Sequence, residues 1–331
     1  MSLTLVTGST GTIGFNIVKL LIERGRSVRV LVRDVTKAKA ILPAECDFFQ
    51  GDITSTAKVE EAMNGCEVVY HCAGLPEQWF SDHTIFDRVN LGGTVNILAS
   101  AKRLRIKKLV YTSTIDVFQA GKSQEYDESI IDPKPKGTHY ERSKQKADQE
   151  VVESMRDGLD VVFLHPSAVY GPGPRIAESV GVNDLILKSH NKDLPMLVPG
   201  GFPVVYSEDV ALGHILAENA KCGSRYILSD KYMTLTDVVS QIYSQLSIEK
   251  PVPISMPVWF AKVFAFAGKA LSSITKKNPL LSRGELTFLQ WQAKPISKKA
   301  KEDLDWNPTS FEDGLKVTIS QMKESRMIGD S

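Results

Sequence analysis

The 331-residue chain has few cysteines, almost no net charge and no long uninterrupted apolar run. Its four cysteines, Cys46, Cys66, Cys72 and Cys222, show neither C-x-x-C pairing nor the spacing of metal ligands. They predict free, mostly buried thiols in a reducing compartment, and no metal site. A net charge of +1 produces no strong electrostatic field that would attract nucleic acid or an acidic partner, so we expect no nucleic-acid binding. Apolar and charged contents of 42% and 24% are typical of a globular protein.

The longest apolar stretch, residues 252–271, is interrupted by Lys262 and Lys269 and contains two prolines near its start. It is too short and too charged to span a bilayer, so we expect no transmembrane segment. We expect this helix to cover a substrate pocket or to pack on its own domain, with an interfacial helix as the alternative. The chain enters a strand directly at its N-terminus, which favours a cytoplasmic protein without a signal peptide.

The first half of the chain alternates strands with helices. The predicted strands are residues 3–6, 28–32, 48–51, 68–71, 108–113 and 160–164, and the predicted helices are residues 14–24, 57–63, 86–104 and 140–154. This rhythm predicts an α/β fold, a Rossmann-type doubly wound parallel sheet that binds ligands at the carboxyl ends of its strands. The breaker-rich run at 171–174 ends the pattern. We expect an NAD(P)-binding domain over residues 1–170, to which 203–220 returns, and a smaller substrate-binding domain over 171–331.

A glycine-rich turn joins the first strand to the first helix. It reads Gly8-Ser9-Thr10-Gly11-Thr12-Ile13-Gly14. Gly8 permits the sharp turn, Gly11 lets the backbone approach phosphates, and Gly14 lets the helix pack closely on the sheet. Free N–H groups and the positive end of a helix suit a pyrophosphate. The alternative is a tight connection without a ligand.

The second strand ends at Arg33, followed by Asp34 and, one helical turn later, Lys37. This position meets the adenosine ribose in dinucleotide folds. An arginine there can hold a 2′-phosphate, which favours NADP, whereas an acidic residue would favour NAD. We therefore expect NADP, with NAD as the alternative through Asp34.

Two further strand ends contain candidate cofactor contacts. Asp52 and Ile53 follow the third strand, where a carboxylate can accept from the adenine amino group or form an Asx-turn. The fourth strand ends at His71 and continues with the small residues listed next, which allow close approach of a cofactor: Cys72, Ala73 and Gly74. His71 alone is typical of a satisfied core histidine.

Tyr140 and Lys144 share one face of a predicted helix. An ammonium about 4 Å from a phenol favours the phenolate by roughly 4 kcal/mol, which would make Tyr140 an acid or base near neutral pH. Ser113 and Thr114 end a strand upstream and would open into the same cleft, where a hydroxyl can hold a substrate oxygen. A surface pair on the helix is the alternative, and Asp116 is not an obvious second catalytic carboxylate.

Together these motifs resemble the extended short-chain dehydrogenase/reductase superfamily over nearly the whole chain. The segments that carry the resemblance are residues 7–14, 51–52, 70–74, 89–94, 110–114, 140–144 and 165–173. The run 28–34, the region of Trp79, residues 139–144 and the C-terminal run 298–308 resemble its dihydroflavonol-4-reductase-like subgroup, which includes proteins labelled hopanoid-associated sugar epimerases.

This resemblance implies roles for particular residues. Tyr140 would be the catalytic acid/base, and Lys144 would lower its pKa and bind the nicotinamide ribose. The hydroxyl partner would be Thr114, with Ser113 as the runner-up, and Asn90 would support the active-site helix. The main chain of Pro166, Ser167 and Val169 would contact the nicotinamide end of the cofactor. Val117-Phe118-Gln119 replaces the usual Val-Tyr-Gly, and Thr114-Ile115-Asp116 lacks the first carboxylate of the dehydratases, which disfavours dehydratase chemistry.

Three functions remain open at this stage. The first is an NADP-dependent reductase that acts on a ketone or aldehyde of a small, apolar substrate. The second is an NAD-dependent sugar-nucleotide epimerase, for which Arg175 and Lys188 would have to contact the diphosphate. The third is a non-catalytic, NADP-sensing regulator. Aromatic residues of the second half either line an apolar pocket or form core: Phe202, Trp259, Phe260, Phe264, Phe266 and Trp291. A homodimer through helices 86–104 and 140–154 is common in the superfamily.

Overall fold

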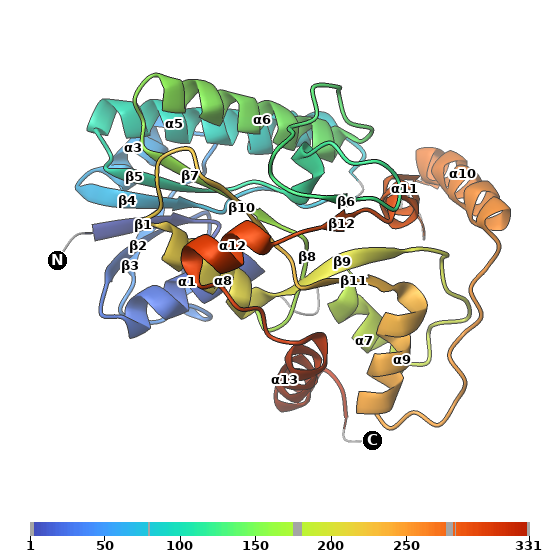
Figure 1. Cartoon of the computed structure of the whole chain (residues 1–331). Coiled ribbons are helices and arrows are strands. Elements are labelled where there is room, and N and C mark those ends of the chain that lie inside the picture. Colours follow the sequence, from blue (N-terminus) through green and yellow to red (C-terminus); the bar gives the residue numbers. More distant parts are fainter. Residues whose placement is uncertain (1–2, 79, 175–180, 276–280, 282, 330–331) are drawn as a thin grey trace.

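A seven-stranded parallel sheet forms the larger part of the molecule (Figure 1). The computed structural model describes residues 3–78, 80–174, 181–275, 281 and 283–329. The strands, in spatial order, are β10 (Arg225–Leu228), β7 (Val161–Pro166), β5 (Lys108–Thr112), β4 (Cys66–His71), β1 (Leu3–Thr7), β2 (Ser27–Val32) and β3 (Asp47–Gln50). The chain order reverses between β1 and β4, and such a reversal opens a ligand crevice at the carboxyl ends of the strands.

Helices cover both faces of this sheet (Figure 1). One face packs against α1 (Thr12–Glu23), α8 (Ser207–Ala217) and α12 (Lys298–Leu304). The other packs against α3 (Thr56–Met63), α5 (Gly93–Leu104) and α6 (His139–Arg156). Burial on both faces explains why the central strands are continuous apolar runs rather than alternating ones. The predicted fold class is confirmed.

The rest of the chain forms a smaller unit around a three-stranded sheet, in the order β11 (Lys231–Thr234), β9 (Gly201–Tyr206) and β8 (Ala168–Tyr170). Its core contains residues of α7 (Val182–His190), α9 (Leu235–Gln245) and α13 (Phe311–Glu324). A separate small cluster joins α10 (Val258–Thr275) to α11 (Arg283–Trp291). Within the described ranges, no helix is long and apolar enough to cross a membrane.

Short elements connect these layers near the carboxyl ends of the strands. They are α2 (Val35–Lys39), α4 (Thr84–Phe86), the π-helix η1 (Asp87–Gly92), the 3-10 helix η2 (Ile115–Val117), β6 (Glu125–Tyr126) and β12 (Lys294–Pro295). The helix predicted over 86–104 is therefore two segments, because its first turns are wound as a π-helix. Such turns often occur at functional sites. Strand β10 joins the large sheet from a region to which the sequence assigned no strand.

Candidate active site

The glycine-rich turn lies against the end of β4. Gly8 has a φ of +71°, and a Cβ there would lie 2.6 Å from the backbone nitrogen of Ala73. A Cβ at Gly14 would run into the carbonyl oxygen of Gly8. Helix α1 begins after Gly11, and no side chain caps its first N–H groups. The Ser9 hydroxyl is buried without a hydrogen-bond partner in the described chain. This cradle of exposed N–H groups fits a pyrophosphate.

A second feature lies at the ends of β2 and β3. An open hollow of about 520 Å³ is lined by Arg33, Gln50, Gly51, Asp52 and Lys58. Two of these side chains are basic and one is acidic, so the hollow has the charge to receive an anionic group. Arg33, the predicted 2′-phosphate ligand, is exposed at its edge.

The acidic residues beside this hollow already have local partners. The Asp34 carboxylate caps α2 by accepting from the backbone N–H of Lys37 at 3.0 Å, and it lies 3.7 Å from the ammonium of the same lysine. Asp52 forms the Asx-turn that was one interpretation of the sequence, since its Oδ1 accepts from the N–H and the hydroxyl of Thr54, each at 2.8 Å. Ile53 is buried against Gly93 of α5. Asp34 is therefore less available to a ribose than Arg33.

His71 is a structural residue. Its ring nitrogens lie 2.8 Å from the Thr7 hydroxyl and 3.0 Å from the Thr94 hydroxyl. Burial lowers the pKa of His71 to about 3, so the ring is neutral. The expectation of a satisfied core histidine is confirmed.

Helix α6 positions Tyr140 and Lys144 at the carboxyl end of β5. Thr138 and Glu141 form a capping box that begins the helix, which places Tyr140 in its first turn. The Tyr140 ring packs edge-to-face on Phe86, with 6.2 Å between centroids. One turn later, the buried Lys144 ammonium donates to the carbonyl oxygen of Thr112 at 2.8 Å.

The pKa of Tyr140 differs from the sequence expectation. Burial raises the pKa of Tyr140 above its ordinary value, the carboxylate of Asp116 adds to this, and hydrogen bonding by the Thr114 side chain acts in the opposite direction. Burial also lowers the pKa of Lys144 to about 8. The expected lowering of the Tyr140 pKa by Lys144 is wrong here, because the ammonium is bound to the Thr112 carbonyl and the phenol is largely removed from water. Tyr140 is thus a proton donor at neutral pH.

The two candidate hydroxyls have different partners. The Ser113 hydroxyl donates to Oδ1 of Asp148 at 2.8 Å. Two nitrogens of Arg225 bind the same carboxylate, at 3.0 and 2.7 Å. Burial alone would raise the pKa of Asp148, but the Arg225 guanidinium outweighs it and holds this pKa below its usual value. Ser113 therefore belongs to a buried ion pair, which leaves Thr114 as the hydroxyl beside Tyr140.

Asn90 connects the π-helix to two other parts of the site. Its amide nitrogen donates to the Ser143 hydroxyl on α6 at 3.0 Å and to the carbonyl oxygen of Leu75 at 3.2 Å. Its oxygen accepts from the backbone N–H of Leu75 at 2.7 Å. A Cβ at Gly74 would lie 3.2 Å from this oxygen. Asn90 thus fixes both the active-site helix and the loop after β4.

The predicted nicotinamide end lies where β7 passes into β8. Pro166 ends β7 and Val169 lies in β8. Between them, the Ser167 N–H donates to the carbonyl oxygen of Leu228 at 3.0 Å, while the Ser167 hydroxyl is buried without a partner among the described residues. That unpaired hydroxyl is a polar group available to a bound cofactor.

Two carboxyl groups near Tyr140, the buried Asp116 and the half-buried Glu77, were not assigned a role from the sequence. Asp116 Oδ2 accepts from the Thr114 hydroxyl at 2.7 Å, and Oδ1 is buried without a partner in the described chain. Burial, and then the charge of Glu141, raise the pKa of Asp116 to about 6. Glu77 accepts from the Thr138 hydroxyl at 2.7 Å, and burial raises its pKa to about 7. No sequence signal identified Glu77, because its partial burial depends on tertiary packing.

The aromatic residues of the second half do not form one pocket. Phe202 is buried in the core of the smaller unit, and Trp291 packs on a cluster near β6. The remaining four are exposed on α10: Trp259, Phe260, Phe264 and Phe266. The interpretation of these four as core is wrong, because their side chains are exposed. Trp79 and Arg175 lie outside the described residues, and Lys188 is paired with Asp184 at 2.7 Å.

The fold and this arrangement define an extended short-chain dehydrogenase/reductase. The profile of the NAD dependent epimerase/dehydratase family matches residues 4–227, and the chain belongs to that family. It is 33% identical over 318 residues to a putative dihydroflavonol 4-reductase of Synechocystis sp., covering 94% of this chain and 91% of the relative. It is 26% identical over 331 residues to sterol demethylase protein B of Methylococcus capsulatus, covering 98% and 99%.

Solved structures agree with this assignment. The crystal structure of gox2253 has a TM-score of 0.84 and 26% identity, covering 99% of this chain and 100% of that one. The UDP-glucose 4-epimerase of Thermotoga maritima, solved with UDP-glucose, has a TM-score of 0.81 and 20% identity over 98% and 99% of the two chains; it supports the fold alone. The protein is therefore an NAD(P)-dependent enzyme of the extended type, as predicted.

Proposed function

We propose that this enzyme is an NADP-dependent oxidoreductase that reduces a ketone or aldehyde of a small, apolar substrate. The observation that carries the proposal is the grouping of Tyr140, Thr114 and Lys144 at the end of β5, with Tyr140 protonated at neutral pH. A carbonyl reduction needs a proton donor at the oxygen that becomes an alkoxide.

The cofactor would be held at two places. The uncapped start of α1 and the glycine turn would bind the pyrophosphate. Arg33 and Lys58, which line the hollow beyond β2 and β3, would bind the 2′-phosphate. Asp34, the residue that would favour NAD, is already engaged as a helix cap. When bound, the cofactor supplies a hydride to the carbonyl carbon.

Three side chains would act on the substrate and its surroundings. The Thr114 hydroxyl, which donates to Asp116 in this structure, would donate to the carbonyl oxygen instead when substrate binds and orient it toward Tyr140. The Tyr140 hydroxyl gives its proton to that oxygen as the negative charge develops. Lys144, whose pKa burial lowers to about 8, is cationic at neutral pH and would bind the nicotinamide ribose of the cofactor. Asn90 keeps the helix that presents both groups in place.

The relatives support an apolar substrate. Their names refer to a dihydroflavonol and to sterols. The contrary candidate, an NAD-dependent sugar-nucleotide epimerase, draws support from the family's name and from a neighbour solved with UDP-glucose. A purely NADP-sensing regulator would not need a complete proton-donor set. The homodimer through α5 and α6 and the cytoplasmic location stay predictions.

Replacing Tyr140 tests the catalytic part of the proposal. Tyr140→Phe removes the proton donor and leaves the ring that packs on Phe86. We expect a loss of at least ~10²-fold in kcat, with NADPH affinity within about twofold of the wild type because no cofactor group depends on that hydroxyl alone. A variant that reduces carbonyls at near wild-type rate would contradict the mechanism.

Replacing Arg33 tests the cofactor preference. Arg33→Ala should weaken NADPH binding ~10- to 100-fold, since a charge-assisted hydrogen bond contributes about 1.5–3 kcal/mol. NADH binding should change little. Arg24→Ala, at an exposed arginine after the far end of α1, is the matched control. Equal losses for both nucleotides would show that Arg33 does not bind the 2′-phosphate.

A further inference from the structure

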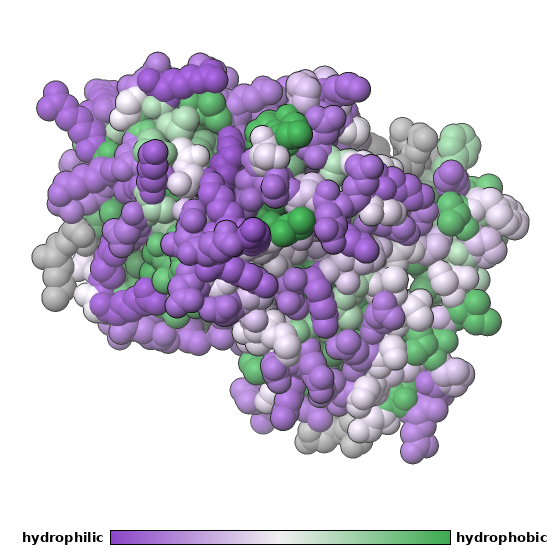
Figure 2. Space-filling model, viewed as in Figure 1, coloured by the Kyte–Doolittle hydropathy of each residue, from purple (hydrophilic) through white to green (hydrophobic). Residues whose placement is uncertain are grey.

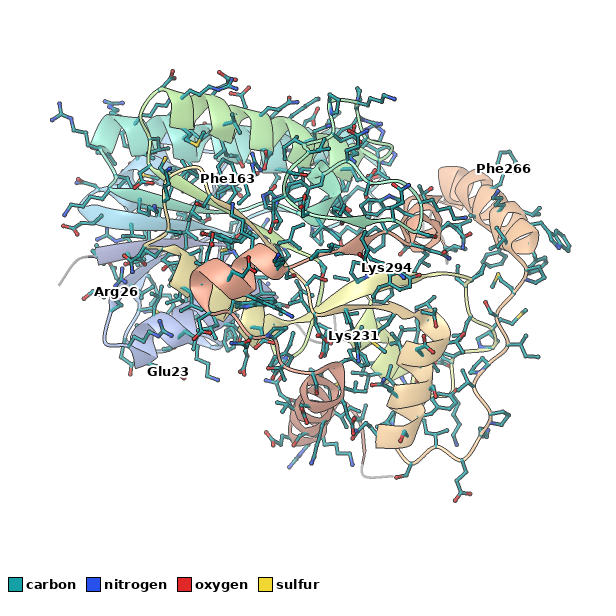
Figure 3. All side chains as sticks on the ribbon, viewed as in Figure 1. Glu23, Arg26, Phe163, Lys231, Phe266 and Lys294 are labelled. Atoms are coloured by element: carbon teal, nitrogen blue, oxygen red, sulfur yellow. The ribbon has the colours of Figure 1, made fainter. Side chains whose placement is uncertain are left out.

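Helix α10 exposes its large apolar residues and buries its small ones. Ala261 and Ala265 are 0% and 2% exposed and face the cluster shared with α11. On the opposite side, Trp259, Val263 and Phe266 are 68%, 59% and 67% exposed. Their spacing, i, i+4 and i+7, makes one continuous stripe. Figure 1 places α10 at the edge of the molecule, and Figure 3 shows the labelled Phe266 there, away from the sheets.

This stripe belongs to the main exposed apolar surface of the described chain. Seven of the twelve large apolar side chains that are exposed lie within residues 254–266. They are Ile254, Val258, Trp259, Phe260, Val263, Phe264 and Phe266. We call these seven residues the α10 patch; apolar residues at this edge are visible in the space-filling view (Figure 2). Exposed large apolar residues gathered in this way mark an interaction surface.

Charge indicates what covers the α10 patch. In the sequence, residues 250–283 contain six basic side chains and no Asp or Glu: Lys250, Lys262, Lys269, Lys276, Lys277 and Arg283. The whole chain has a net charge of only +1, so this stretch of the sequence is more basic than the rest, and the exposed Lys262 lies within α10 itself, between Phe260 and Phe264. A second copy of the same surface would bring like charges together. An anionic lipid surface would satisfy both features, because lipid tails accept the aromatics and headgroups accept the lysines.

The position of α10 relative to the active site is consistent with that partner. A Cβ at Gly284, in the first turn of α11, would lie 3.1 Å from both Glu77 Oε1 and Thr138 Cγ2. Thr138 caps the helix that holds Tyr140. Helix α11 therefore lies against the start of the active-site helix, and α10 packs on α11. A surface bound at the α10 patch would therefore lie across α10 from α11 and the elements that border the catalytic residues.

We propose that α10 is an interfacial helix that docks the enzyme on an anionic lipid surface, inserting Trp259, Val263 and Phe266 among the lipids. No segment of this helix needs to cross the bilayer. Docking stands independently of the reductase chemistry; where the proposed function also holds, docking brings the active-site border close to a reservoir of apolar substrates.

Vesicle flotation of the full-length protein tests this proposal. The probes are phosphatidylcholine vesicles with and without phosphatidylglycerol, at low and high salt. The wild type should float with the phosphatidylglycerol vesicles, and high salt should weaken this binding. Trp259→Ser with Phe266→Ser should reduce the bound fraction at least tenfold. Lys262→Gln should reduce binding to anionic vesicles more than binding to neutral ones.

A matched control separates this patch from exposed apolar residues in general. Ile130→Ser with Val317→Ser changes side chains that are 55% and 47% exposed elsewhere, and it should leave flotation unchanged. NADPH binding by each variant verifies folding without depending on turnover. The proposal is overturned if the wild type stays in the aqueous fraction with every vesicle, or if the α10 double variant floats like the wild type. It is also overturned if that variant only converts an oligomer to a monomer.

Discussion

The buried carboxyl group of Asp116 should make the stability of the enzyme depend on pH in a defined direction. Its pKa is raised from 3.8 to about 6 in the folded protein, first by burial and then by Glu141. Because the pKa is higher in the folded state, folding favours the protonated carboxyl. Below about pH 4 the group is protonated in both states and contributes nothing. Its ionisation destabilises the fold progressively as pH rises to about 6.

The size of this effect follows from the shift. A difference of about two pKa units corresponds to about 3 kcal/mol in the free energy of unfolding. Asp116 is only 8% exposed, so solvent screening reduces this value little. Asp116→Asn removes the ionisation and keeps an oxygen that can accept from Thr114. The variant should gain stability relative to the wild type between about pH 4 and 6, and the gain should then stay constant.

Urea unfolding of both proteins across this pH range measures the difference directly. Any cost of burying the amide of Asn is independent of pH. The informative quantity is therefore how the difference in unfolding free energy between the two proteins changes with pH, and not its absolute value. Asp127→Asn is a control of opposite sign, since hydrogen bonds from Ser129 lower the pKa of that exposed carboxyl. A difference between wild type and Asp116→Asn that is flat from acid to neutral pH would refute the reasoning.

Two pairs of variants test the other assignments. Ser113→Ala should lower the free energy of unfolding by about 1.5–3 kcal/mol, since it removes a hydrogen bond to a buried carboxylate, and should leave turnover nearly intact. Thr114→Val also removes a hydrogen bond to a buried carboxylate, that of Asp116, so turnover separates the two variants: Thr114→Val should lower kcat ~10²-fold or more in steady-state assays, and equal kinetic effects would contradict the assignment. Gly8→Ala should abolish nucleotide binding in calorimetry, because the added Cβ would meet the Ala73 backbone. Gly25→Ala is the control: Gly25 also has a positive φ, +70°, but has open space around it, so this variant should lose only about 1 kcal/mol of stability through backbone strain. Retained binding in Gly8→Ala would show that the turn tolerates a side chain.

Much of the fold could be predicted because its signals are local. Strands buried on both faces must be apolar throughout, and β1, β2, β4, β5 and β7 were all predicted within a few residues. Strand β10 was missed because its four residues, Arg225–Leu228, become a strand only by pairing with β7, far away in sequence. The π-helical turns of η1 were missed for a related reason, since hydrophobic periodicity does not distinguish them from an α-helix.

The candidate site also has features that local sequence predicts and features that depend on tertiary packing. The glycine turn and the Tyr140–Lys144 pair have fixed spacings along the chain and were identified directly. The direction of the Tyr140 pKa and the separation of Ser113 from Thr114 depend on burial and on Asp148, which no local pattern gives. On α10, the sequence gives the hydrophobic content, but only tertiary packing determines that the alanines face inward.

The most direct test of the central claim is to identify the nucleotide bound by the purified enzyme and to measure its exchange with NADPH and NADH. We predict exchangeable NADP, with NADPH bound at least ~10-fold more tightly than NADH, as Arg33 and Lys58 beside the adenosine end require. Tightly retained NAD that exchanges with neither nucleotide would contradict an NADP-dependent reductase and favour the epimerase.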